Sequence, residues 1–398
     1  MTLTRRELFM GKTSTKLPST RALFDDKDVL VCIFQRGGAD GLNSVVPYGD
    51  ENYSLHRGAI QVPEPGEENG AIDLTGFYGL HPALSPLKSI YDAGDLALVH
   101  AVGVPHGSRS HFAAQGLVER GVDDKAGPTN GWLGRHMSLS EPPGDSAFRT
   151  VSISGNVPLM LLGAQEPLAI SNLTEFGFEQ SIIDSGYTEV LANLFRQTVP
   201  FSSPAQAALG AIDELQVANL SQYSAENGAA YPSSDLGKKI QQAAQLIKSE
   251  LPVEAVCLDS DGWDHHENLP TSINASLGDL ADCLSAFYTD MGSRMANITV
   301  LVHTEFGRRV AANASSGVDH GTAGVAYLMG GGVNGGQVAG TWPGLAEGDL
   351  EQGEDLAIST DLRSVIAEML SKRLGGTTLS SVFPEFEGGS DLNLFSSR

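Results

Sequence analysis

The chain has 398 residues, 41% of them hydrophobic and 18% charged, so it can bury a large core, and we expect one α/β domain over residues 28–398. Its 25 Lys and Arg face 48 Asp and Glu, a formal charge of −23, which argues against a nucleic-acid partner because phosphate binding depends on clustered basic side chains. No run reaches the ~18 apolar residues of a membrane-spanning helix, so no membrane span is predicted.

The first 27 residues are predicted to be a loose tail. Thr4–Met10 contains the pair Arg5-Arg6 and is similar to a twin-arginine export signal, but the residues that follow, Gly11–Pro18, are polar rather than apolar. Two interpretations stay open. A degenerate signal would place the protein in the periplasm, and a chance arginine pair would leave it in the cytoplasm.

The first strand is predicted at residues 29–34, where a continuous apolar run indicates burial on both faces of a mostly parallel sheet. The turn Gly37–Gly41 follows it and brings Asp40 to the carboxyl end of the strand, where open α/β sheets place ligands. Residues 51–79 show turn residues and little periodicity. Leu80-His81-Pro82 then opens a helix, and residues 96–102 form the next strand.

A strand, a tight turn and a helix follow one another at residues 96–119. The turn carries Ser108, Arg109, Ser110 and His111, and the free N–H groups at the start of the helix favour an anion there. A hydroxyl at this point is well placed to attack a phosphorus or sulfur centre. The alternative is that Ser110 only caps the helix, which is the commoner role of serine at such a position.

Residues 131–250 read as mixed, with Ala- and Gln-rich helical patterns that predict a helical insertion near 175–250. Beyond them the apolar periodicity predicts strands at 253–258, 298–302 and 325–329, and helices at 277–291 and 362–374, the last one closed by Gly375. Strands that alternate with helices predict an α/β class fold whose mostly parallel central sheet is flanked by helices. Cys32, Cys257 and Cys283 lie inside these elements, which favours buried thiols over disulfides.

Carboxylates and imidazoles gather at the ends of the predicted strands. Asp264 and His266 would supply two metal ligands from one loop, with Asp261 and His265 as the alternative pair, and His320 would supply a third. Asp40 and Glu305 would add carboxylates from two further strands. These side chains suit Zn²⁺ or Mn²⁺, and Mg²⁺ accepts the carboxylates, so one or two divalent ions are expected.

Basic side chains near these ligands are candidates for binding an anionic substrate. Arg109 or Arg308 could hold two substrate oxygens bidentately, and Arg36 adds local positive charge against the acidic background. His111 is a further candidate for substrate binding. The expected partner is therefore an anionic small molecule or a saccharide ester.

Several segments together resemble a bacterial family known as domain of unknown function 1501. They span nearly the whole chain in order: Phe34–Asn43, Leu80–Leu84, Ser108–Phe112, Gly131–Arg135, Gly262–His266, Thr304–Arg308, Asp319–Gly321 and Thr360–Arg363. That family is grouped with the alkaline phosphatase and sulfatase superfamily, whose members use a metal-activated Ser, Thr or formylglycine at a helix N-terminus. The resemblance implies an alkaline-phosphatase-like fold.

The resemblance also implies roles for single residues. Asp40, Asp264, His266, Glu305 and His320 would be metal ligands, and Ser108 or Ser110 the nucleophile. Superfamily enzymes usually carry an adjacent Asp-His pair where this chain has Glu305-Phe306, and their usual Asp-x-x-x-His spacing fits Asp261 with His265. The chain has no formylglycine motif near residue 108.

The hypothesis from sequence is a metal-dependent hydrolase of phosphate or sulfate esters in which Ser110 or Ser108 attacks and Arg109 orients the anion. A bound water could replace the serine as nucleophile. The alternative function is a non-catalytic binding or assembly protein that retains the fold, which the missing Asp-His pair favours.

Overall fold

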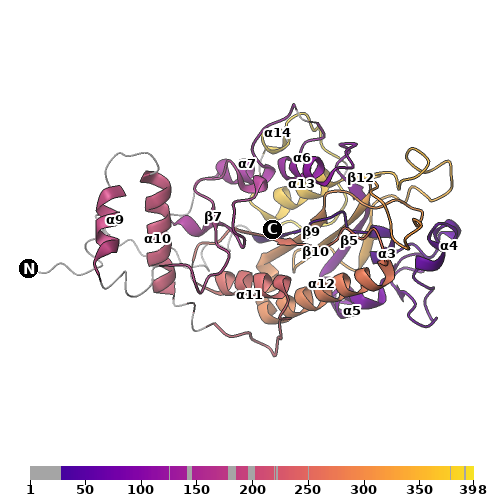
Figure 1. Ribbon diagram of the computed structural model, residues 1–398, viewed down its shortest axis with the longest axis horizontal. Helices are drawn as coiled ribbons and strands as arrows, with labels where there is room; N and C mark the ends of the chain where they lie inside the picture. Colours follow the sequence, from indigo (N-terminus) through magenta and orange to yellow (C-terminus); the bar gives the residue numbers. More distant parts are fainter. Residues whose placement is uncertain are drawn as a thin grey trace, which may run out of the picture.

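The computed structural model describes residues 28–398 except 125, 141–145, 178–184, 196–201, 219, 221–222, 250, 377 and 390. The predicted tail, with its Arg5-Arg6 pair, lies outside the described residues. Within them the predicted α/β class is confirmed: a central sheet is covered by helices on both faces (Figure 1).

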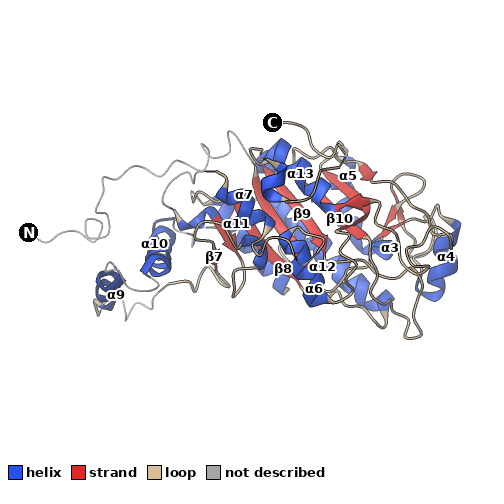
Figure 2. Ribbon diagram, turned by 90° about the horizontal axis from the view of Figure 1, so that it is seen from above, coloured by secondary structure: helices blue, strands red, loops and turns tan. Residues whose placement is uncertain are grey.

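The central sheet has the strand order β11-β5-β10-β9-β1-β8-β6-β7, and β12 also pairs with β5 (Figure 2). All strand pairs are parallel except those of β10, which runs antiparallel to both β5 and β9. The strands are β1 (Val29–Gln35), β5 (Leu96–Gly103), β6 (Thr150–Ser152), β7 (Leu168–Ala169), β8 (Ala255–Ser260), β9 (Ile298–Thr304), β10 (Gly324–Met329), β11 (Gln337–Ala339) and β12 (Thr360–Asp361).

Burial on both faces explains the continuous apolar sequence of the central strands. In β1, Val29, Val31 and Ile33 belong to one hydrophobic cluster, and the alternate residues Leu30, Cys32 and Phe34 belong to another. Successive side chains of a strand point to opposite faces, so a strand covered on both sides must be apolar throughout. All three cysteines are buried free thiols, as predicted.

Two groups of helices form the outer layers (Figure 1). The first cluster is shared by α5 (Ser85–Asp92), α11 (Asp235–Lys248) and α12 (Leu269–Met291). The second is shared by α6 (His111–Arg120), α7 (Trp132–Ser138), α13 (Leu362–Arg373) and α14 (Leu379–Val382). The region of the predicted insertion contains α9 (Tyr187–Phe195), α10 (Ser202–Ala218) and α11. Of these, α9 and α10 lie to one side of the sheet. Short 3-10 helices lie at Gly58–Ile60, Pro82–Leu84, Ala147–Arg149, Leu159–Leu161 and Gly292–Asn297.

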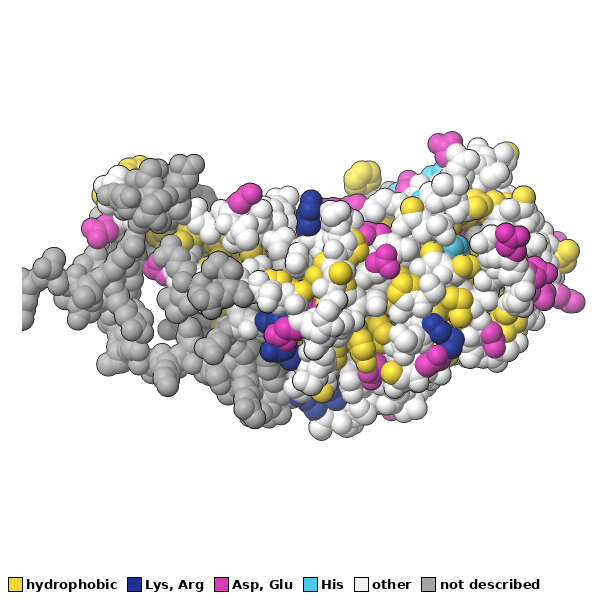
Figure 3. All heavy atoms as spheres, turned by 90° about the horizontal axis from the view of Figure 1, so that it is seen from below, with side chains coloured by type: hydrophobic (Ala, Val, Ile, Leu, Met, Phe, Trp, Pro, Cys, Tyr) yellow, Lys and Arg dark blue, Asp and Glu magenta, His cyan; other side chains and the backbone are white. Residues whose placement is uncertain are grey.

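The surface beside α11 and α12 mixes hydrophobic, acidic and basic side chains (Figure 3). The acidic groups on that face are dispersed rather than gathered in one patch. None of the helices in the described part of the chain is both long and apolar enough to span a membrane.

The segment after β1 contains structure that the sequence pattern did not reveal. It forms α3 (Gly41–Ser44), α4 (Glu51–Arg57) and a small antiparallel sheet of β2 (Val45–Val46), β4 (Gly79–Leu80) and β3 (Ile72–Asp73). These elements place Arg57 beside Asp40, in the turn that follows β1. Its guanidinium donates to both oxygens of Asp40, at 2.6 and 2.8 Å, and both side chains are almost fully buried.

We predict that Arg57→Met lowers the free energy of unfolding by about 3–5 kcal/mol, because it leaves the Asp40 carboxylate buried without its partner. Urea denaturation would measure the change. The matched control is Lys88→Met, which removes an exposed pair with Asp92 and should cost about 0–1 kcal/mol. Equal effects of the two substitutions would contradict the importance given to the buried pair.

Candidate metal centre

Four loops meet at the edge of the sheet where β1, β5, β8 and β9 end. Because β10 is antiparallel, it begins at that same edge, so the segment before it joins the loops that follow the other strands. The glycine turn after β1 fits tightly here. Gly37 has φ +120°, and a Cβ on it would lie 2.7 Å from the backbone nitrogen of Asp264. The sheet topology therefore gathers residues from five parts of the sequence.

Three histidines at this edge each donate their Nδ1–H to an oxygen. His111 Nδ1 lies 2.8 Å from Glu305 Oε1, His266 Nδ1 3.0 Å from Asp319 Oδ1, and His320 Nδ1 2.7 Å from the carbonyl oxygen of Arg109. A carbonyl or a carboxylate only accepts, so each ring carries its proton on Nδ1. Ligating histidines are typically held by such an outer contact.

Both acceptor carboxylates are held ionised. Burial would raise the pKa of Glu305, but hydrogen bonds from Gln115 and His111 outweigh it and lower that pKa. For Asp319, burial again opposes the hydrogen bonds from His266 and Asn313, and its pKa is also lowered. Burial lowers the pKa of His320, which favours its neutral ring.

The Nε2 atoms of the same three histidines lie close to one carboxylate oxygen, Asp264 Oδ1. His320 Nε2 lies 3.0 Å from His111 Nε2 and 2.9 Å from His266 Nε2. Asp264 Oδ1 lies 3.0 Å from His266 Nε2 and 3.4 Å from the Nε2 atoms of His111 and His320. With every Nδ1 protonated, these four atoms are all acceptors, and acceptors this close require a cation between them, either an added proton or a metal ion.

The spacing of these atoms fits a metal ion. The candidate ligands His111, Asp264 and His320 lie within 4.8 Å of one another, and His266 adjoins two of them. Zn–N distances of about 2.0–2.1 Å place neighbouring ligands of a tetrahedral zinc about 3.3 Å apart, close to the separations found here. The donor set of imidazole nitrogens and one carboxylate is also one that zinc accepts.

Arg308 neutralises Asp264 and ties the loops together. Burial raises the pKa of Asp264, but the Arg308 guanidinium, 2.6 Å from Asp264 Oδ1, lowers it to about 2. Arg308 also donates to the carbonyl oxygens of Gly37, Gly38, Val318 and Trp263. The predicted substrate-binding Arg308 is thus buried and committed to the protein itself.

The predicted ligands fall into three groups. Asp264, His266 and His320 come together, so the geometry favours this pair over Asp261 with His265. Asp261 faces Lys239 at 3.8 Å, and His265 faces Ser276. Glu305 adjoins the cluster but orients His111 through one oxygen, while its other oxygen accepts from Thr304. Asp40 does not join the cluster, because Arg57 occupies both of its oxygens.

His111 is a candidate ligand that sequence reasoning assigned to substrate binding instead. Its position at the start of α6 was visible in the sequence. Its place opposite His320 depends on the packing of β5 beside β10, which no local pattern encodes.

The predicted catalytic residues lie just before His111. Ser110 is the N-cap residue of α6, but its side chain makes no capping hydrogen bond and the residue is exposed. Ser108 Oγ accepts from the backbone N–H of Ser110 at 3.3 Å. The Arg109 side chain pairs with the buried Asp355, so it is not free in this structure to orient an anion.

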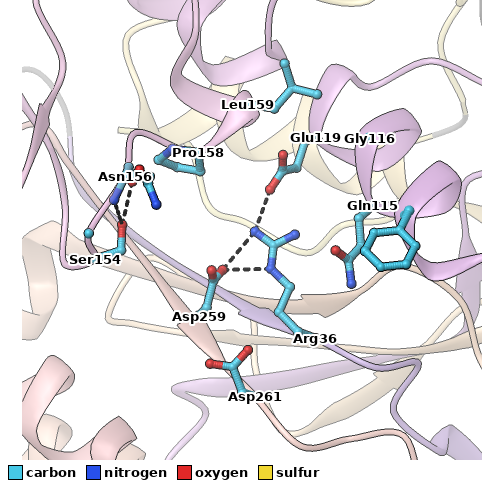
Figure 4. Close-up of a pocket in the computed structure, with 12 residues that line it drawn as sticks. Arg36, Gln115, Gly116, Glu119, Ser154, Asn156, Pro158, Leu159, Asp259 and Asp261 are labelled. Carbon is cyan, nitrogen blue, oxygen red and sulfur yellow. Dashed lines mark hydrogen bonds and ion pairs between the residues drawn. The ribbon is translucent and has the colours of Figure 1, made fainter. Parts of the chain in front are cut away.

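A cavity of about 600 Å³, whose lining residues are drawn in Figure 4, lies next to the cluster. Gln115 lines the cavity and donates to Glu305 Oε1 at 3.0 Å. The predicted substrate-binding Arg36 also lines it, but its guanidinium pairs with Glu119 at 2.5 Å and with Asp259 at 2.9 Å. The charge of Arg36 is therefore already neutralised by carboxylates within the cavity wall.

We predict that Glu305→Gln and Asp319→Asn each weaken zinc binding about 10–100-fold, because they remove the anionic acceptors that orient His111 and His266. Competition with a chromogenic chelator would measure the dissociation constants. Glu67→Gln, an exposed residue outside the cluster, is the control and should leave affinity unchanged. Wild-type affinity in both test variants would contradict the outer-contact role.

Comparison with known proteins identifies the family and finds distant structural relatives. A search of curated proteins found no match. Among solved structures, the zinc complex of the C-terminal periplasmic domain of EcEptC from Escherichia coli has 9% identity and a TM-score of 0.41, covering 94% of this chain and 93% of that one. The PsFucS1 sulfatase from Pseudoalteromonas sp. has 12% identity and a TM-score of 0.37, covering 95% and 74%.

The family model described as "Protein of unknown function (DUF1501)" matches residues 99–375, which include His111, Asp264, His266 and His320. The match takes in more than half of the sequence. The chain belongs to the DUF1501 family.

Proposed function

We propose that this protein is a metal-dependent hydrolase of phosphate or sulfate esters. The observation that carries the proposal is the convergence of three Nε2 atoms and Asp264 Oδ1, all acceptors, at the sheet edge where α/β proteins bind ligands. A divalent ion held by His111, Asp264, His266 and His320 would polarise the ester and offset the charge that develops on its oxygens.

The chain's own residues would prepare this site for reaction. Glu305, Asp319 and the Arg109 carbonyl hold the three rings in one tautomer and one orientation. The first N–H groups of α6 and its dipole favour an anionic group beside His111. Ser110 precedes His111 directly and keeps its hydroxyl outside the helix cap, which supports its role as the attacking group.

The cavity beside the cluster would accept the organic part of the ester. Its Arg36 is already paired with Glu119 and Asp259, and Asp261 adds a further carboxylate to its wall. Such a lining repels a phosphate or sulfate, which supports placing the anionic group at the metal cluster and the alcohol portion in the cavity.

A second candidate function is a binding or assembly protein with a structural ion. The specific observation in its favour is the number of protein ligands: four side chains complete a tetrahedral zinc, which is the closed arrangement of structural sites. Catalytic sites keep one position for water or substrate.

Metal removal and restoration would decide between these candidates. We predict that protein stripped by a chelator loses turnover of p-nitrophenyl phosphate or sulfate and regains it with zinc or manganese. His320→Ala should abolish turnover, while His56→Ala, a histidine of α4, should retain it. If the restored protein binds metal but turns over no phosphate monoester, phosphodiester or sulfate, the hydrolase proposal fails and the structural-ion candidate takes its place.

The nucleophile needs a separate comparison. We predict that Ser110→Ala abolishes turnover and Ser108→Ala reduces it only partly, because Ser108 serves the turn by accepting from the backbone of Ser110. Trapping of a phosphorylated or sulfated enzyme by mass spectrometry would identify the attacked residue. Full turnover in both variants would instead indicate attack by water.

A further inference from the structure

A fixed positive charge touches two of the four candidate ligand atoms. Arg308 Nη2 lies 2.6 Å from Asp264 Oδ1, and Arg308 Nη1 lies 3.5 Å from His266 Nε2. The Arg308 side chain is fully buried. The anionic oxygen that faces the histidines is therefore shared with a guanidinium on its other side.

Arg308 cannot leave to make room for another ion. Its Nε donates to the carbonyl of Gly38 at 2.5 Å, its Nη1 to that of Val318 at 3.0 Å, and its Nη2 to those of Gly37 and Trp263. These carbonyls belong to three different loops, so moving the side chain would break the contacts that join them.

An aromatic ring packs against two of the candidate ligands. The Phe306 ring packs against the rings of His111 and His320, with centroids 4.8 and 5.0 Å apart. It lies so close to Gly38 that a Cβ there would meet it at 2.5 Å. Phe306 offers no ligand atom, and its neighbour Glu305 is engaged by His111, Gln115 and Thr304.

We propose that the cluster holds one divalent ion and that Arg308 supplies the second positive charge beside Asp264. This inference rests on the proposed metal centre and deepens it. Arg308 is then a positioning residue that acts through Asp264 and His266 without touching the substrate. A second dication bound to Asp264 would lie close to the guanidinium and be repelled by its charge.

The test is the metal stoichiometry of the full chain under excess metal. Purified protein is loaded with zinc, freed of loosely bound ions by gel filtration, and analysed by plasma mass spectrometry against protein concentration. A parallel sample loaded with Mn²⁺ is examined by electron paramagnetic resonance. The expected results are one equivalent of zinc and the spectrum of an isolated Mn²⁺ ion, both lost in His320→Ala.

Two equivalents, or a spin-coupled Mn²⁺ pair, would overturn the one-ion inference and leave the hydrolase proposal standing. One equivalent without ester turnover would have the opposite effect, sustaining the inference and removing the function. If no metal binds at all, both the one-ion inference and the hydrolase proposal fail.

Arg308→Lys tests the positioning role. Lysine keeps the charge but has three N–H donors where arginine has five. We expect one equivalent of zinc with affinity reduced about 10–100-fold, as for other outer contacts of a metal site. Far-ultraviolet circular dichroism would confirm that the variant is folded, and wild-type affinity in a folded variant would contradict the role.

Discussion

The outer hydrogen bonds of three histidines determine what the whole sheet edge can do. An imidazole has two nitrogens, and committing Nδ1–H to an oxygen leaves Nε2 as a lone pair with a fixed direction. Here the three acceptors come from different places: Glu305 after β9, Asp319 before β10, and the backbone of Arg109 after β5. The arrangement requires several loops to be correctly placed at once. It leaves the Nε2 atom of each of the three histidines as an acceptor.

Charge at this edge is balanced locally although the chain as a whole is strongly acidic. Arg57 matches Asp40 in the interior, Arg308 matches Asp264 at the cluster, and Arg36 matches Glu119 and Asp259 in the cavity wall. The three arginines that the sequence predicted to bind substrate, Arg36, Arg109 and Arg308, are each paired with a carboxylate of the protein. These three arginines therefore have no unpaired charge for an anionic ligand, which is why the candidate metal centre is the key to the proposed activity.

Much of the fold could be predicted because its central strands and long helices have clear apolar periodicity. The predicted strand at 29–34 and the predicted helix at 277–291 correspond to β1 and α12, and the Ala- and Gln-rich helical patterns predicted within 131–250 include α11. The short strands β6, β7, β11 and β12 were not predicted, since two or three residues give no period to detect. The small sheet of β2, β3 and β4 was missed for the same reason, and α4 was missed because residues 51–79 show little periodicity.

The candidate site was only partly predictable, for a related physical reason. Asp264, His266 and His320 follow or precede strongly apolar strands, so their position at the sheet edge could be inferred from sequence. Asp40 has the same local signature, yet its environment depends on Arg57, which lies in the segment without periodicity. The position of His111 next to the other candidate ligands depends on which strands are neighbours, and no local sequence pattern encodes the strand order.

The strand order also has a kinetic consequence. Apart from β9 with β10 and β6 with β7, neighbouring strands of the central sheet are not consecutive in the sequence. A topology of such high contact order folds slowly, because long loops must close before their contacts contribute. The four candidate ligands belong to segments that meet only when β5, β8 and β10 are all in place. Capture of an ion would then occur late in folding, and the ion would draw the chain toward the native state by mass action.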